Sequence, residues 1–90
     1  MRYPDAVTIL RPRGSDEYDN PGASWAAPAE ISAVGFLMGD MCLMPPRTDV
    51  RAGDRLRIAD RVYDVIGDPE VIRSPVRDVL ILVKVDRRRP

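Results

Sequence analysis

Residues 49–70 read DVRAGDRLRIADRVYDVIGDPE and contain two short runs in which apolar residues recur at every second position. The first run covers residues 54–59, and the second, residues 61–67, is rich in β-branched and aromatic side chains. Successive side chains of a strand point to opposite faces of a sheet, so this period is typical of half-buried strands. Because Ala59-Asp60 is too short a connection for a crossover helix, the pattern predicts an antiparallel hairpin.

Turn-forming residues bound this hairpin. We expect it to begin at Gly53 and to stop at Gly67-Asp68-Pro69, since glycine permits unusual backbone angles and proline cannot donate to a ladder. Tight hairpins prefer Asn-Gly or Asp-Gly at their tip, and Ala-Asp meets that preference poorly. The sequence therefore predicts a slightly longer loop or a bulge at the tip.

The chain has 90 residues, which suits one small domain with a modest core that self-association would help to stabilise. Its hydrophobic content of 44% and charged content of 31% are ordinary for a soluble globular protein. The 14 basic residues equal the 14 acidic ones, so no net field draws the whole molecule to nucleic acid. Thirteen of the bases are arginine, the cation best suited to interfaces, although a GC-rich coding sequence would also favour arginine.

Few residues suit catalysis or metal binding. The absence of histidine removes the usual general base and the commonest zinc ligand. Cys42, the only cysteine, lies in an apolar run and is expected to be a small core residue. The acidic residues Asp16, Glu17 and Asp19 lack the later glutamate of a calcium loop, which favours solvated charge. We expect a soluble protein made in the cytoplasm that is not an enzyme, has no cofactor or metal, and does not contact a membrane.

Further strands are expected at residues 6–11, 29–38, 41–44 and 79–85, with Pro12 ending the first and a bend at Gly35 in the second. Periodicity alone also allows a short buried helix over residues 29–38, and the β-branched residues around Gly35 favour the strand. The last of these is apolar on both faces, which indicates a central strand covered on both sides. Closing such strands into a cylinder removes exposed edges. The predicted fold is all-β, a small antiparallel β-barrel of SH3-like or connector type with five or six strands, spanning residues 1–90 as one domain.

Two long loops are predicted, at residues 13–25 and 68–78, together with a disordered basic tail at residues 86–90. Tyr18 and Trp25 lie in the first loop, where aromatic side chains commonly anchor protein interfaces. An alternative for Trp25 is that it folds back over the small core.

Three stretches carry a resemblance to a known family: YPDAVTILRP at 3–12, DEYDNPGASW at 16–25, and TDVRAGDRLRIADRVYDVIGDPEVIRSP at 48–75. Followed by a valine-rich last strand, this ordered set resembles the head-to-tail stopper (head-completion, head–tail connector) proteins of long-tailed bacteriophages. The resemblance implies a ring, typically dodecameric, in the neck of the virion below the portal and adaptor proteins. It further implies retention of the packaged DNA in the channel, docking of a tail terminator or tail-tube protein, and a period in the host cytoplasm during assembly.

Under this hypothesis the loops at 13–25 and 45–52 contact neighbouring subunits or the adaptor. The candidate interface residues are Tyr18, Trp25, Arg47, Arg51, Arg73 and Arg77, the four arginines being candidates for ion pairs between subunits.

Two other interpretations stay open. The first is a separate SH3-like or OB-like module that binds nucleic acid or peptide, which predicts a positive or aromatic face. Interspersed charges and an aromatic content of 6% weigh against it. The second is a small hydrolase or an inhibitor of a host enzyme, and the lack of histidine weighs against the hydrolase.

Overall fold

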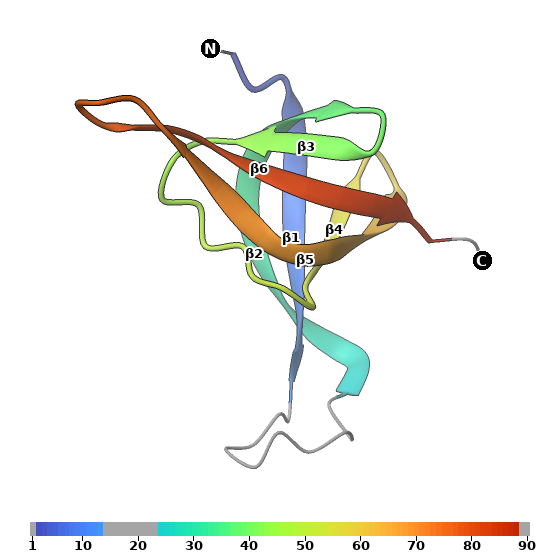
Figure 1. Ribbon diagram of the computed structural model, residues 1–90. Coiled ribbons are helices and arrows are strands. Elements are labelled where there is room, and N and C mark those ends of the chain that lie inside the picture. Colours follow the sequence, from blue (N-terminus) through green and yellow to red (C-terminus); the bar gives the residue numbers. More distant parts are fainter. Residues whose placement is uncertain (1, 14–23, 89–90) are drawn as a thin grey trace.

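The computed structural model describes residues 2–13 and 24–88 (Figure 1). This part of the chain contains six strands: β1 (Asp5–Arg13), β2 (Ser24–Met38), β3 (Met41–Met44), β4 (Arg55–Ile58), β5 (Arg61–Arg73) and β6 (Asp78–Arg87). They close into a barrel in the order β1-β2-β3-β6-β5-β4, and each neighbouring pair is antiparallel. The prediction of a small, all-β antiparallel barrel is confirmed.

The core follows the two-residue period of the strands. Leu56 and Ile58 of β4 point inward and are buried, whereas Arg57 between them is exposed, as the alternation predicts. Val83 of β6 is likewise fully buried, and burying an aliphatic side chain of this size contributes about 1.5–3 kcal/mol. Cys42 of β3 is a core residue as expected, and burial raises the pKa of its thiol to about 11.

Gly35 of β2 is buried, and the neighbouring strand β3 leaves no room for a side chain there. A Cβ atom at Gly35 would lie 2.9 Å from the Cys42 Sγ atom and 3.1 Å from the Leu43 carbonyl oxygen. The glycine predicted to bend this strand is therefore required by a close approach inside the barrel. The strand is also longer than predicted, because β2 extends back to Ser24 and includes Trp25, which was assigned to the preceding loop.

The β4–β5 turn corrects one prediction. Only Ala59 and Asp60 separate the two strands, with φ angles of 50° and 66°, so there is neither a longer loop nor a bulge. Two positive φ angles are characteristic of a type I′ turn, whose twist matches that of the flanking strands. Pairing of Leu56 with Tyr63 and of Ile58 with Arg61 fixes the register, and this overrides the local preference of Ala-Asp.

This turn leads to a stability prediction. We expect the double substitution Ala59→Asn with Asp60→Gly to raise the free energy of unfolding by about 1 kcal/mol, since non-glycine residues in the left-handed region are strained. Urea denaturation measures the change. Ala52→Asn, at an exposed position without a positive φ, is the matched control and should have little effect. Equal shifts in both proteins would contradict the strain argument.

The predicted end of the hairpin at Gly67-Asp68-Pro69 is wrong, and so is the predicted loop at residues 68–78. β5 continues to Arg73, and only residues 74–77 join it to β6. The β5–β6 register shifts between Ile66 and Glu70, and Gly67 has a φ of 68°, so the residues expected to end the strand form a bulge. A bulge needs the same glycine conformation as a turn, and Pro69 lies outside the paired positions.

The bulge gives the barrel an extension. Beyond it, β5 and β6 continue as a two-stranded hairpin that reaches past the rest of the barrel (Figure 1). Bulges bend a strand and increase its twist, which accounts for the departure of this hairpin from the barrel wall. Residues 70–79 are called the arm below.

Both chain ends are more regular than predicted. Pro12 does not end β1, which continues to Arg13 through an irregularity in its pairing with β2. The predicted disordered tail begins in strand, because β6 runs to Arg87 and pairs it with Tyr63. The Arg88 amide donates to the Val62 carbonyl at 2.9 Å, and residues 89–90 lie outside the described part of the chain.

Candidate interaction surfaces

The connection between β3 and β4 folds back onto the barrel. Val50 is only 8% exposed and belongs to the core cluster. The hydroxyl of Thr48 donates to the Pro45 carbonyl at 2.7 Å, and the Val50 amide donates to the Thr48 carbonyl at 3.0 Å. This segment was predicted to contact neighbouring subunits, and in the structure it packs against the core of its own barrel through Val50.

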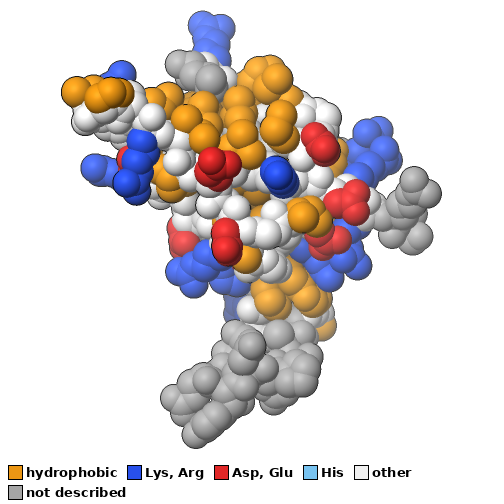
Figure 2. Space-filling view, in the orientation of Figure 1, with side chains coloured by type: hydrophobic (Ala, Val, Ile, Leu, Met, Phe, Trp, Pro, Cys, Tyr) orange, Lys and Arg blue, Asp and Glu red, His pale blue; other side chains and the backbone are white. Residues whose placement is uncertain are grey.

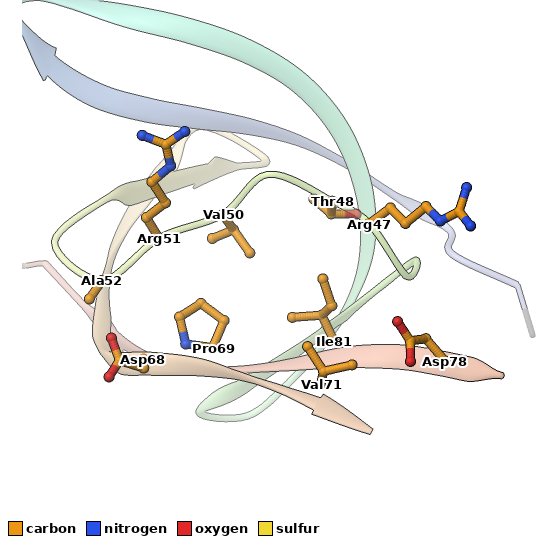
Figure 3. Close-up of a pocket in the computed structure, with 10 residues that line it drawn as sticks. All are labelled: Arg47, Thr48, Val50, Arg51, Ala52, Asp68, Pro69, Val71, Asp78 and Ile81. Carbon is orange, nitrogen blue, oxygen red and sulfur yellow. The ribbon is translucent and has the colours of Figure 1, made fainter. Parts of the chain in front are cut away.

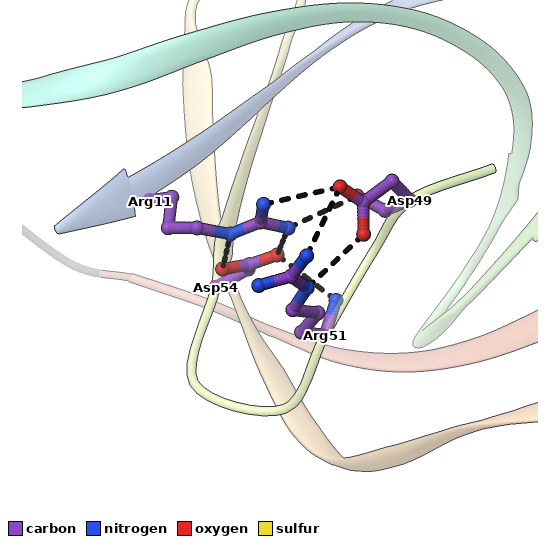
Figure 4. Close-up of polar contacts among 4 residues, drawn as sticks. All are labelled: Arg11, Asp49, Arg51 and Asp54. Carbon is purple, nitrogen blue, oxygen red and sulfur yellow. Dashed lines mark hydrogen bonds and ion pairs between the residues drawn. The ribbon is translucent and has the colours of Figure 1, made fainter. Parts of the chain in front are cut away.

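A partly buried ion pair fastens the β3–β4 connection to β1 (Figure 4). Arg11 donates from Nε and Nη2 to the two carboxylate oxygens of Asp54, at 3.1 and 2.8 Å. Asp54 is 3% exposed and also accepts the Arg51 backbone amide at 2.9 Å. The hydrogen bonds to Asp54 raise the pKa of Arg11 above its usual value. This forked geometry is the strongest form of arginine–carboxylate contact and holds the connection in one position.

Arg11 also reaches Asp49 on the outside of the same connection. Its Nη1 lies 3.2 Å from Asp49 Oδ2, and its Nη2 donates to the Asp49 carbonyl at 3.0 Å. The hydrogen bond from Arg11 lowers the pKa of the Asp49 carboxyl, and a second one from Arg51 adds to the effect. Arg51 is therefore paired within its own chain.

The four candidate arginines divide into two pairs. Arg51 is joined to Asp49 at 3.1 Å and Arg73 to Asp78 at 3.1 Å, in exposed ion pairs of the kind that contribute little to stability. Arg47 and Arg77 are exposed and make no ion pair within residues 2–13 and 24–88. Both line a hollow between the arm and the start of the β3–β4 connection. Tyr18 lies outside the described residues, as does most of the loop predicted around it.

A second, open hollow of about 480 Å³ lies between the β3–β4 connection and β5 (Figure 3). Val50, Pro69, Val71 and Ile81 supply its apolar part, and charged side chains stand around them. The lining residues are Arg47, Thr48, Val50, Arg51, Ala52, Asp68, Pro69, Val71, Asp78 and Ile81. Such a hollow suits an apolar side chain of a partner, since apolar walls with a polar rim are typical of binding sites.

Trp25 lies in β2, is half-buried and does not belong to the core cluster. The Arg55 guanidinium carbon lies 3.7 Å from the centre of the indole ring, in a cation–π contact. Around the pair is a hollow of about 500 Å³ whose lining includes Arg61, Arg87 and Arg88. An aromatic ring among arginines suits a planar or anionic ligand.

The outside of the barrel carries an apolar surface that was not predicted from the sequence. Figure 2 shows hydrophobic side chains gathered over β3 and β6. We call it the outer apolar face and define it as Val34, Phe36, Met38, Met41, Leu43, Ile66 and Leu82, from β2, β3, β5 and β6. Strand pairing joins Phe36 to Leu43 and Leu43 to Leu82 in one row across three strands.

Several members of this face are largely exposed: Val34 by 45%, Met38 by 44% and Ile66 by 49%. The available signal was the run of apolar residues on both faces of the strand predicted at residues 79–85. That pattern predicted a strand covered on both sides, whereas its outward residue Leu82 is only partly buried by the described residues. Contiguous apolar patches on a barrel wall mark sites of association.

The chain matches no family model, no curated protein and no solved structure. Within the described residues, no helix is long and apolar enough to cross a membrane, and no group of three or more side chains could hold a metal ion. The fold and surfaces define a small closed β-barrel with a projecting arm, an outer apolar face and an arginine-lined hollow at Trp25.

Proposed function

We propose that the chain is a ring-forming head-to-tail stopper subunit from the neck of a long-tailed bacteriophage. In this role it lies below the portal and adaptor proteins, helps to retain packaged DNA and provides the docking surface for the tail. The resemblance of residues 3–12, 16–25 and 48–75 to that family supports the proposal. The observation that carries it is the outer apolar face.

This face suits lateral packing better than small-molecule binding. It is spread over the wall of the barrel on four strands instead of lining one enclosed cavity. Subunits of a ring contact their neighbours through their sides, and identical copies bury two different patches in each contact. Equal numbers of basic and acidic residues also suit packing of identical copies, because opposite charges can meet around an apolar centre.

The test is electron microscopy of a lysate from a phage whose copy of this gene carries a stop codon. The expected result is separate tails beside capsids that have lost their DNA. Supplying the intact chain from a plasmid should restore complete virions and serves as the control. Normal, infectious virions without the chain would refute the proposal.

The hollow at Trp25 favours a second candidate, a binding module for nucleic acid or peptide. Arg55 on the indole ring, with Arg61, Arg87 and Arg88 nearby, resembles the aromatic and basic surfaces on which bases stack. This candidate predicts binding of single-stranded DNA that falls steeply with added salt and weakens with Trp25→Ala. Salt-independent or undetectable binding would exclude nucleic acid as its ligand.

A further inference from the structure

We propose that the arm of one copy of this chain docks on the outer apolar face of the next copy. The inference names the contact by which the proposed ring closes and rests on the proposed function for its biological setting. Its physical basis is independent of that setting, because two unlike and complementary surfaces occur on one small chain.

The tip of the arm is a turn that several hydrogen bonds hold in place. The Ser74 amide donates to the Arg77 carbonyl at 2.8 Å, and the Ser74 hydroxyl donates to the same carbonyl at 3.1 Å. The Ser74 hydroxyl oxygen in turn accepts the amides of Val76 and Arg77 at 3.4 and 3.3 Å. Arg73 and Asp78 join the two strands just behind the turn at 3.1 Å. Contacts of this kind hold a tip in one shape before binding, which lowers the entropy lost on docking.

This ordered tip displays apolar side chains to solvent. Val76 is 87% exposed at the tip, while Val71 and Val79 on the strands behind it are 41% and 43% exposed. A single exposed valine is unremarkable in a surface loop. Three of them on one projecting hairpin with a fixed turn supply apolar surface that a neighbouring copy can cover.

The arm and the outer apolar face are accessible on the same copy at the same time. The arm reaches beyond the barrel, whereas the face lies over the barrel wall formed by β2, β3 and β6 (Figures 1 and 2). The tip valine and the face residue Phe36 are both exposed, by 87% and 38%, so the arm does not cover the face of its own copy. A contact between two different patches is heterologous and propagates from copy to copy, closing into a ring when the rotation allows it.

Charges at the two surfaces are complementary. Arg77 follows Val76 at the arm tip, and Asp40 lies in the turn between Met38 and Met41 at the edge of the face. Both are exposed, and the described part of the chain offers an ion-pair partner to neither. A docked arm would place Arg77 at Asp40. Charges at such a rim fix the register of an apolar contact.

Lys84 adds a constraint on how the arm lies. It stands between Met41 and Ile66 in the strand pairing and is exposed on the same face. The Asp40 carbonyl accepts the Val85 amide at 2.8 Å, so Asp40 lies close to Lys84. Repulsion between Lys84 and Arg77 therefore favours an approach to Asp40 from the β2 side, away from β6. The surface favoured by charge is therefore Phe36, Met38 and Asp40.

Complementary knock-outs test the proposal with the purified chain. Phe36→Asp disables the face and leaves the arm intact, and Val76→Asp does the reverse. By sedimentation at concentrations up to ~1 mM, we expect the native chain to associate and each variant alone to weaken association about tenfold or more. An equimolar mixture of the variants should form dimers and nothing larger, because one intact contact remains.

Controls separate this result from damage to the fold. Ala59→Asp, at an exposed position in the β4–β5 turn and outside both surfaces, should leave association unchanged. Met38→Asp repeats the face knock-out at a second exposed site should Phe36→Asp fail to fold. A native chain that stays monomeric, or a variant mixture that does not recover dimers, would overturn the proposal.

Disulfide trapping supplies a second readout. Cys42 is fully buried and its pKa is raised to about 11, so it is not expected to form disulfides. Any cross-link then comes from the introduced cysteines. Mixing Val76→Cys with Phe36→Cys should give a cross-linked dimer that neither variant forms by itself. Dimers from Val76→Cys alone would mean that two arms meet, which contradicts docking on the face.

The two proposals fail in different ways. Loss of DNA from stop-codon capsids combined with no recovery of dimers would refute only the arm contact. Association of the purified chain combined with normal virions would refute only the stopper function.

Discussion

Replacing Asp54 with asparagine is expected to lower the free energy of unfolding by about 2–3 kcal/mol. Asp54 is 3% exposed and accepts hydrogen bonds from Nε and Nη2 of Arg11 and from the Arg51 backbone amide. Asparagine has one acceptor oxygen, and its amide group would turn donors toward a guanidinium that can only donate. The estimate lies below that for a fully buried pair because the Arg11 side chain is 21% exposed. Urea denaturation at neutral pH, followed through the fluorescence of the single tryptophan, measures the loss.

Asp49→Asn is the matched control, because Asp49 contacts the same arginine from an exposed position. We expect a smaller loss, and one that shrinks with added salt. The pKa of Asp49 is lowered from 3.8 by Arg11, so its stabilising effect is complete above that value and disappears as the pH falls through the lowered pKa. An Asp49→Asn loss as large as that of Asp54→Asn would contradict the role given to burial.

The strands that the sequence predicted best are those whose alternation reflects one buried face. Leu56 and Ile58 identified β4 because Arg55 and Arg57 alternate with them. In β6 the alternation holds over Ile81, Val83 and Val85, whereas Leu80 is also buried and Val79 is exposed. The continuation of β5 beyond Gly67 could not be predicted in this way. Its register is fixed by pairing with β6, and the glycine angle that suits a turn equally suits a bulge.

The candidate surfaces were harder to predict, for two physical reasons. All four candidate arginines are exposed, although Arg73 lies in β5 and not in a loop. Ion pairing could not be predicted, because it depends on which carboxylates the fold brings near. Arg73 and Asp78 meet only because β5 and β6 pair there, so no sequence period signals that contact. The outer apolar face was not predicted, because apolar residues on both faces of a strand indicate that both faces are buried. One of the two faces can instead be exposed and form a site of association.

Gly35→Ala is expected to destabilise the barrel by about 2–3 kcal/mol through overpacking. Its new methyl would lie 2.9 Å from the Cys42 Sγ atom, 3.1 Å from the Leu43 carbonyl oxygen and 3.3 Å from a Val7 methyl. The sulfur can be removed, whereas the carbonyl belongs to the β3 backbone and cannot move without disturbing its ladder. Urea denaturation of the variant and the native chain measures the effect.

A double-mutant cycle with Cys42→Ala tests this mechanism. When the sulfur is absent, Gly35→Ala should lower the free energy of unfolding by only about 1 kcal/mol. This remaining loss comes from the close contact with the Leu43 carbonyl oxygen. Gly39→Ala is the control, because Gly39 has a φ of 60° and a Cβ atom there meets nothing within 4 Å. Its cost, about 1–2 kcal/mol of backbone strain, should be unchanged by Cys42→Ala. Equal rescue at both glycines would show that Cys42→Ala stabilises the chain generally, and the close approach of β2 to β3 would then not be the reason for glycine at position 35.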